Sequence, residues 1–389
     1  MNIFTGNVKG EILLVEKNTT EVEKYKAIFS GSYNLIDASS GKAVLEIVEL
    51  KKIDAILICG ILQDIDIVEF CHKIRENPKL ISLPIVLLCE QDEMNYVLKA
   101  LNAGADGYFI KPINEKEIVA QISQLIEERK PQSIKTKAKP SGIKTILLTS
   151  NKGGTGVSTI VANWGYALSK FFNKKVLLID AAGYTNHLSV LLNVECINSL
   201  SMYYSDYSKI SKQFLNDTIV KVNNNLGILN LLTKISDINK IKIPILDWIL
   251  ETAREEYDYI LIDLKAGIFD EKSLFLITKA DEIHIVSTYD PLTIKDTGSF
   301  MNILKEFGVH EKKIKLLINR ADCVVGDLNP ESFEQSQYQM AFWAFPNDWF
   351  GCIESASKGR SIIEHAPKSK LAKEFKIFAE HYIKQELHT

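Results

Sequence analysis

The chain has 389 residues, of which 46% are apolar and 24% charged, a composition typical of a globular protein and a length that suits two domains. The net charge of −3 excludes a gross bias towards nucleic acid, so any affinity for DNA or a membrane would come from a local patch. The sequence shows no signal peptide, no apolar run of the roughly 20 residues that span a bilayer, and six cysteines without C-x-x-C spacing, which predicts a cytoplasmic protein with free thiols.

Residues 10–128 alternate short apolar runs, rich in branched side chains, with segments of helical period. Such runs suit buried parallel strands. They are Glu11–Val15, Ala55–Ile58, Pro84–Leu88 and Gly107–Ile110. The segments of helical period include Ile65–Glu76, Glu93–Ala103 and Glu115–Arg129. This alternation predicts a doubly wound, flavodoxin-like α/β domain over residues 1–129.

The next stretch, residues 130–142, contains two prolines and several lysines but almost no large apolar residue, and we interpret it as a linker. Alternation of strands and helices then restarts over residues 143–389. The strand candidates are Thr145–Thr149, Lys175–Ile179, Tyr259–Ile262, Glu282–Val286 and Ile314–Ile318. The sequence therefore predicts a second doubly wound α/β domain.

The first domain resembles a response-regulator receiver through the segments ILLVEKN, ILICGILQDID, PIVLLCEQDE and GADGYFIKPI. A working receiver uses an acidic pair to hold Mg²⁺, an aspartate to accept phosphate, a hydroxyl to sense it and a lysine to pair with it. Here the acidic pair reads Glu16-Lys17, and cysteines, Cys59 and Cys89, replace the acceptor and the hydroxyl. Only the lysine, Lys111, survives. We therefore expect a pseudo-receiver that is not phosphorylated and that docks a partner or dimerises.

The two cysteines allow two interpretations. As buried thiols, Cys59 and Cys89 would act as small apolar side chains, and we prefer this interpretation. As accessible thiolates they would sense oxidants instead.

A glycine-rich loop, SNKGGTG at residues 150–156, follows the first strand of the second domain and leads into a helical segment. A strand, a glycine-rich loop and a helix N-terminus together form an anion site, because backbone N–H groups and the helix dipole both favour phosphate. Glycines let the backbone approach the phosphates closely. The segment therefore predicts a site for the phosphates of a nucleotide.

The loop resembles the deviant Walker A motif of the ParA/MinD family of P-loop ATPases, K-G-G-x-G-K-[ST]-T. The resemblance implies that ATP binds along the whole loop. Its residues are Lys152, Gly153, Gly154, Thr155, Gly156, Val157, Ser158 and Thr159. In the family, the lysine at Lys152 acts catalytically by reaching across a dimer to the partner's nucleotide, and the hydroxyl at Ser158 binds Mg²⁺. The second lysine, which grips the β- and γ-phosphates, is replaced here by Val157.

Two further segments, KKVLLIDAAG at residues 174–183 and YDYILID at residues 257–263, resemble family motifs and extend the resemblance over about residues 143–385. The resemblance implies that Asp180 is a catalytic acid and that Asp263 belongs to the Mg²⁺ shell. Ala182 stands where the family has a second acid, which positions the attacking water. The resemblance also implies a set of residues around adenine. They are Asn319, Arg320, Pro346 and Asp348.

The two replacements weaken the expected activity. Loss of one charged donor to phosphate typically costs a few kcal/mol, and loss of a water-positioning acid removes a further catalytic factor. We therefore expect Mg²⁺ and ATP to bind, with slow or absent hydrolysis.

A pseudo-receiver followed by such an ATPase domain resembles the TadZ/CpaE family of tight-adherence (Flp) pilus assembly proteins. The resemblance implies a homodimer formed through the ATPase domain, and a receiver-like domain that contacts the pilus secretion machinery or a polar landmark protein. It also implies concentration at a cell pole or the inner face of the membrane. The alternative is a ParA-type ATPase that partitions DNA or cargo, which the absence of a strong nucleic-acid signal disfavours. A reductase of the nitrogenase iron-protein type lacks the expected cysteine loops and ranks last.

The last segment, Ser369–Leu387, has one apolar stripe that comprises Leu371, Phe375, Phe378, Tyr382 and Ile383. This spacing predicts a helix that packs on its own domain. A basic amphipathic helix that binds membrane, as in MinD, is the alternative. Acidic residues interleaved with the lysines favour the first interpretation.

Overall fold

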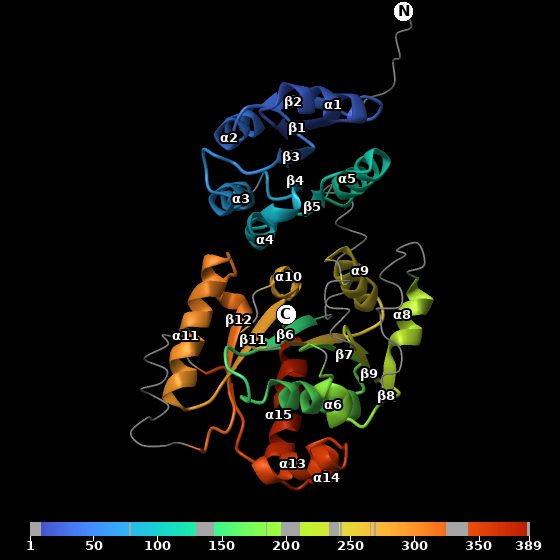
Figure 1. Cartoon of the computed structure of the whole chain (residues 1–389), viewed down its shortest axis with the longest axis vertical. Helices are drawn as coiled ribbons and strands as arrows, with labels where there is room; N and C mark the ends of the chain where they lie inside the picture. Colours follow the sequence, from blue (N-terminus) through green and yellow to red (C-terminus); the bar gives the residue numbers. More distant parts are fainter. Residues whose placement is uncertain are drawn as a thin grey trace, which may run out of the picture. The chain divides into compact units, whose positions relative to one another are not determined.

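The computed structural model describes residues 9–77, 79–129, 144–183, 185–195, 211–232, 241, 243–264, 266–267, 270–323 and 341–386. The chain divides near residue 140 into two units, each built around a sheet of buried apolar strands with helices on both faces (Figure 1). This confirms the predicted α/β class for both. The predicted linker, residues 130–142, lies outside the described residues.

The first unit has a five-stranded parallel sheet in the order β2-β1-β3-β4-β5. Its elements are β1 (Glu11–Val15), α1 (Thr19–Phe29), β2 (Asn34–Ala38), α2 (Gly41–Leu50), β3 (Ala55–Cys59), α3 (Ile67–Glu76), β4 (Ile85–Cys89), α4 (Met94–Asn102), β5 (Gly107–Ile110) and α5 (Glu115–Arg129). Helices α1 and α5 lie on one face of the sheet, and α2, α3 and α4 lie on the other (Figure 1). The central strands are buried because helices cover them from both sides.

The second unit has an eight-stranded sheet in the order β13-β12-β11-β6-β10-β7-β9-β8, parallel except for β8. Its strands are β6 (Lys144–Thr149), β7 (Val176–Ala181), β8 (Val220–Asn223), β9 (Leu226–Asn230), β10 (Tyr259–Leu264), β11 (Glu282–Ser287), β12 (Ile314–Ile318) and β13 (Trp343–Ala344). Its helices are α6 (Val157–Phe172), α7 (His187–Leu191), α8 (Lys212–Thr218), α9 (Ile243–Arg254), α10 (Glu271–Lys279), α11 (Pro291–Glu306), α13 (Trp349–Ser357), α14 (Ile362–His365) and α15 (Lys370–Glu386).

Helix α6 covers one face of this sheet at β6, β7 and β10, and α9 and α10 cover the other (Figure 1). The strands that the sequence pattern predicts are the five parallel ones at the centre, from β7 to β12 in the sheet order. They are buried and apolar. Because they are also parallel, the loops that follow their carboxyl ends lie at the same edge of the sheet.

The last helix packs on its own domain, as predicted from its apolar stripe. Phe375, Phe378 and Tyr382 are at most 1% exposed. The rings of Phe378 and Tyr382 each lie 4.8 Å, centroid to centroid, from the indole of Trp164 on α6. No helix among the described residues is both long and apolar enough to cross a membrane.

A buried polar network lies beside this aromatic cluster. The Tyr382 hydroxyl is 2.7 Å from Glu282 Oε2 and 2.7 Å from His284 Nε2, and Lys144 Nζ lies 3.6 Å from Glu282 Oε1. Although burial acts to raise it, the contacts with His284, Tyr382 and Lys144 lower the pKa of Glu282 to about 2. Burial lowers the pKa of His284, which keeps the imidazole neutral. The network joins the first residue of β6 to the last helix.

Candidate nucleotide-binding site

The glycine-rich loop lies between β6 and α6, at the carboxyl edge of the sheet. Gly153 and Gly154 are exposed, and no atom lies within 4 Å of a Cβ built on either of them. No side chain of the described residues caps α6, so the N–H groups of its first turn are available to a ligand. An open loop at an uncapped helix N-terminus fits the phosphates of a nucleotide.

Two residues after β12 hold this loop in place. Asn319 donates from Nδ2 to the Thr155 carbonyl at 2.7 Å, and Arg320 donates to the Gly154 carbonyl at 3.1 Å. Gly156 has a φ of +99°, and a Cβ there would lie 2.3 Å from Asn319 Nδ2. Asn319 and Arg320, predicted to bind adenine, therefore brace the phosphate loop in this structure, and their contact with a base stays a prediction.

Lys152 forms an ion pair within its own unit. Its Nζ lies 3.2 Å from Oδ1 of Asp290, just before α11, and the two side chains are 42% and 40% exposed. Burial acts to raise the pKa of Asp290, but hydrogen bonds from Thr288, Thr293 and Lys152 hold it well below its usual range. An exposed pair of this kind is worth only about 0–1 kcal/mol, so the lysine can exchange Asp290 for a phosphate at little cost.

Val157 and Ala182 occupy the two positions where the resemblance implies a lysine and a second acid. Val157 packs against the core cluster that contains α6, and Ala182 is 8% exposed. Neither side chain can donate a hydrogen bond to phosphate or polarise a water molecule. Slow or absent hydrolysis at this site stays a prediction.

Two carboxylates lie side by side at the ends of neighbouring strands. Asp180 on β7 is in register with Asp263 on β10, and both are at most 1% exposed. Burial, and then the charge of Asp180, raises the pKa of Asp263 to about 7. Burial also raises the pKa of Asp180, against two backbone hydrogen bonds.

Asp263 and Ser158, the predicted Mg²⁺ ligands, are brought together. The Ser158 hydroxyl hydrogen-bonds the Asp263 carboxylate, and Asp263 Oδ2 is buried with no hydrogen-bond partner among the described residues. A buried carboxylate oxygen without a partner is costly unless a ligand satisfies it. Oxygen donors of this kind suit Mg²⁺, which usually takes one or two protein ligands together with phosphates and water. The residues present therefore fit the cation.

Asp180 plays a different part from its neighbour. Its Oδ1 accepts from the Ala182 amide at 3.1 Å and its Oδ2 from the Leu188 amide at 3.2 Å. Both oxygens thus shape the turn that leads into α7. The catalytic role implied for Asp180 stays a prediction.

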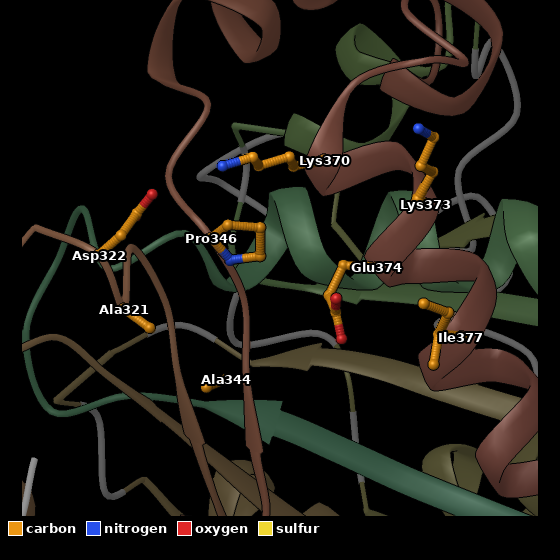
Figure 2. A pocket seen from close by; sticks show the side chains of 8 residues that line it. All are labelled: Ala321, Asp322, Ala344, Pro346, Lys370, Lys373, Glu374 and Ile377. Carbon is orange, nitrogen blue, oxygen red and sulfur yellow. The ribbon is translucent and has the colours of Figure 1, made fainter.

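The two remaining predicted residues lie further along the same edge. Asp348 caps α13 by accepting from the Gly351 amide at 3.0 Å. Pro346 lines a groove of about 560 Å³ that α15 bounds with Lys370, Lys373 and Ile377 (Figure 2). Their contact with adenine also stays a prediction.

Sequence reasoning missed Asp290, the partner of Lys152. The signal was available in the segment TYDPLT, residues 288–293, because an aspartate followed by proline marks a helix start. Asp290 accepts from the hydroxyls of Thr288 and Thr293, at 2.6 and 2.5 Å. No pattern linked this helix start to a loop 138 residues earlier in the chain.

In the receiver-like unit, the residues at the corresponding positions contact other groups of the same unit. Glu16 Oε1 accepts from the amides of Lys17 and Asn18 at 2.7 and 2.8 Å, and Lys111 Nζ lies 3.5 Å from Glu90 Oε1. Burial, together with Glu16, raises the pKa of Cys59 well above its usual range. Burial raises the pKa of Cys89 to about 12. Both thiols are therefore neutral near pH 7, which favours small apolar side chains over reactive thiolates.

Comparison with known proteins assigns each unit. Residues 12–123 match the response regulator receiver domain, and residues 143–318 match a family described as AAA domain. The septum site-determining protein MinD of Thermotoga maritima is 32% identical over 177 residues, which cover 45% of this chain and 63% of that protein. The chain thus spans less than two thirds of the length of this relative.

Solved structures extend the comparison for the second unit. A ParA family ATPase from Chlorobium tepidum TLS is 25% identical, with a TM-score of 0.57 over 61% of this chain and 99% of that one. MinD from Pyrococcus horikoshii OT3, complexed with Mg-ADP, is 26% identical, with a TM-score of 0.54 over 62% and 97%. The chain therefore joins a receiver domain to an ATPase domain of the ParA/MinD type.

Proposed function

We propose that this protein is an ATP-binding assembly factor that positions a tight-adherence pilus secretion system. Its ATPase domain binds Mg·ATP, dimerises with the nucleotide and hydrolyses it slowly or not at all. The observation that carries the proposal is the combination of two altered sites. The receiver-like unit lacks the acceptor aspartate, and the nucleotide site has Val157 and Ala182 in place of a lysine and an acid but keeps Ser158 and Asp263 for a cation. This combination is the one that resembles the TadZ/CpaE family.

Different residues of the site would bind the phosphates and the cation of Mg·ATP. The open backbone at Gly153 and Gly154 and the N–H groups that start α6 receive the phosphates. Ser158 and Asp263 would hold Mg²⁺, which neutralises phosphate charge when it is bound. Asn319 and Arg320 keep the loop in its binding conformation. Lys152 exchanges Asp290 for the nucleotide of a second copy, as the resemblance implies.

A proton balance at Asp263 accompanies cation binding. With a pKa of about 7, this carboxyl is partly protonated at neutral pH. Metal ligands must be deprotonated, so Asp263 would give up that proton if it held Mg²⁺. Asp263 would therefore bind the cation in its deprotonated form, with Ser158 beside it.

The first test is biochemical. The full chain should bind Mg·ATP, turn it over at well below the roughly 1 s⁻¹ of a slow enzyme, and double its molar mass in light scattering when Mg·ATP is added. Absence of nucleotide binding would refute the ATPase part of the proposal. Fast hydrolysis would refute the assignment as a slow or inactive ATPase.

The second test is cellular. A fluorescent fusion of the full chain in its host should form a focus at a cell pole, and deletion of the gene should abolish tight-adherence pili. The receiver-like domain alone should then retain contact with the secretion machinery or with a polar landmark protein. Normal pili in the deletion strain would refute the pilus role.

The similarity to a ParA family ATPase favours one other function, partitioning of DNA or cargo. A partitioning ATPase of this kind binds nonspecific DNA through phosphate contacts that weaken steeply with salt. A gel-shift assay with nonspecific duplex DNA and Mg·ATP separates the two functions. We expect no shift near physiological salt.

A further inference from the structure

Arg320 places a guanidinium group against the phosphate loop. Its Nη2 donates to the carbonyl of Gly154 at 3.1 Å, and Gly154 is an exposed residue with no atom within 4 Å of a Cβ built on it. A guanidinium carries five N–H donors, and this bond to Gly154 is the one that the side chain makes among the described residues. The other donors of Arg320 are therefore available beside the open part of the loop.

The charge of Arg320 has no acidic partner at short range. Among the residues that the structure describes, no carboxylate forms an ion pair with its guanidinium. Lys152 of the same loop, in contrast, pairs with Asp290 at 3.2 Å. An unpaired cation beside a helix N-terminus adds to the local field that favours a phosphate group.

The backbone of Arg320 is held in an unfavourable conformation. Its φ is +54°, and the other non-glycine residues with positive φ in the described part of the chain are asparagines, which tolerate this region better than arginine does. The Arg320 amide donates to Asn319 Oδ1 at 3.0 Å, and the Arg320 carbonyl accepts from the Cys323 amide at 2.9 Å. Strain of this kind persists where the surroundings impose it, and it is concentrated at ligand sites. The fold thus holds Arg320 at the loop at a cost in free energy.

A cation at this place offsets a lack of charge at the start of α6. The first residue of that helix is Val157, whose apolar side chain packs on the core, and the first turn carries no charged side chain. Charged donors make stronger hydrogen bonds to phosphate than neutral ones, and the planar fork of arginine fits phosphate oxygens. Arg320 can supply both the charge and the fork from the end of β12.

We propose that Arg320 is a phosphate-binding residue of the nucleotide site, which supplies the positive charge that the start of α6 lacks. This inference rests on the proposed binding of Mg·ATP, and it assigns Arg320 to the phosphates and not to the base. When the nucleotide binds, the guanidinium exchanges the Gly154 carbonyl for phosphate oxygens. Asn319 continues to hold the loop through the Thr155 carbonyl.

The test measures the phosphate and base contributions separately in the full chain. Two probes are used with Mg²⁺: ATP, titrated by calorimetry, and inorganic tripolyphosphate, which has no base, measured by its displacement of a fluorescent ATP analogue. Arg320→Gln keeps an N–H donor for the Gly154 carbonyl but removes the charge, and Arg320→Gly removes the side chain and relieves the backbone. Arg360→Gln, at an exposed position after α13, is the matched control. Thermal midpoints establish that the variants fold.

We expect Arg320→Gln and Arg320→Gly to weaken the binding of both ATP and tripolyphosphate by about tenfold to a hundredfold, the range for a hydrogen bond to a charged group. Arg360→Gln should bind both probes as tightly as the wild type. Addition of Val157→Lys to Arg320→Gln should restore most of the lost affinity. The same change should gain less in the wild type, because the two cations then serve the same phosphates.

Weaker binding of ATP with unchanged binding of tripolyphosphate would assign Arg320 to the base and overturn the proposal. Unchanged binding of both probes would leave Arg320 as a brace of the loop and would overturn it too. A loss that Val157→Lys does not restore would come from a displaced loop, with the same consequence. These three results leave the proposed function intact, whereas a wild type that binds neither probe would overturn the proposed ATP binding as well.

Discussion

The receiver pocket and the P-loop pocket have each lost residues on which phosphate chemistry depends, but the remaining groups behave differently. In the receiver pocket, Glu16 binds two backbone amides and Lys111 pairs with Glu90. In the P-loop pocket, Asp263 keeps a buried oxygen without a partner among the described residues, and two glycines leave open space. The charged groups named at the first site have partners within their own unit, whereas one buried oxygen at the second site has none among the described residues.

This contrast separates the loss of catalysis from the loss of binding. A site that has become purely structural no longer gains from holding unsatisfied polar atoms, because each one costs about 1–3 kcal/mol. Under the proposed function, a cation bound at Asp263 would offset this cost. The predictions below test whether the two pockets differ in this way.

The largest effect should come from refilling the P-loop pocket. Val157→Lys with Ala182→Asp restores one phosphate donor and one water-positioning acid, and we expect ATP turnover to rise by roughly 10³-fold. The lysine stem can lie along the apolar surface that Val157 now covers. Steady-state turnover at saturating Mg·ATP measures the change, and Val157→Met is the control for size. An unchanged rate would mean that further parts of the site are missing.

The next effect concerns the network under the last helix. The lowered pKa of Glu282 stabilises the folded state fully above its ordinary value of 4.5, and this contribution of about 3 kcal/mol disappears as the pH falls towards 2. The lowered pKa of His284 acts in the same direction, because the unfolded state takes up a proton below about pH 6.5. Acid should therefore unfold this unit progressively.

Glu282→Gln should lower the free energy of unfolding at pH 7 and flatten its decline between pH 4.5 and 2. Tryptophan fluorescence follows the second unit selectively, because Trp164, Trp248, Trp343 and Trp349 are the four tryptophans of the chain. Glu364→Gln, at an exposed position of α14, is the control. Parallel pH profiles for Glu282→Gln and the wild type would contradict the assigned charge.

A change at Asp263 should have a smaller effect, which favours folding but disfavours Mg²⁺-dependent ATP binding. Asp263→Asn removes a buried charge beside Asp180, so the thermal midpoint of the protein without nucleotide should rise or hold at pH 8. The same change should weaken Mg²⁺-dependent ATP binding by about tenfold, the range for loss of one charged contact. Calorimetric titration with and without Mg²⁺ measures the second quantity. Loss of stability together with unchanged Mg²⁺ dependence would mean that Asp263 is structural.

At the receiver-like unit we expect no phosphorylation at all. A small-molecule phosphodonor with Mg²⁺ should leave the mass of residues 1–129 unchanged, since Cys59 cannot form an acyl phosphate. Cys59→Asp alone should also fail, because Lys17 repels the cation. Cys59→Asp with Lys17→Asp is the positive control. An acid-labile adduct on the unmodified chain would contradict this prediction.

The sequence predicts the sheets well where strands are buried on both faces and poorly at their edges. The run ILLV in β1 is apolar throughout because helices cover both sides of it. The edge strand β2, NLIDA, has exposed positions at Asn34 and Asp37. Because these residues are typical of turns, the sequence pattern did not predict a strand here. The edge strand β8, VKVN, is missed for the same reason, β13 because it has only two residues, and β9 because a glycine interrupts its short apolar run.

The candidate site divides along similar lines. Ser158 and Asp263 follow from motifs, because a loop after β6 and the end of its neighbour β10 must meet at one sheet edge. The partners of Lys152 and Asp348 do not follow, because Asp290 and the Gly351 amide are set by how loops fold over that edge. The segment WFGCI, residues 349–353, holds three large apolar residues, but the sequence alone does not show that the structure leaves them exposed on α13.

The contact of Lys144 with Glu282, and of Glu282 with Tyr382, has a topological consequence. It brings the place where the chain enters the second unit close to the helix with which it leaves, so the two ends of this unit are neighbours in space. Domains with adjacent ends tolerate circular permutation. A permutant that joins residue 386 to residue 144 through a short linker, and opens at the turn Asn224–Asn225 between β8 and β9, should keep the sheet and the P-loop. Such a permutant would show that the fold of this unit does not depend on the order in which its strands follow one another along the chain.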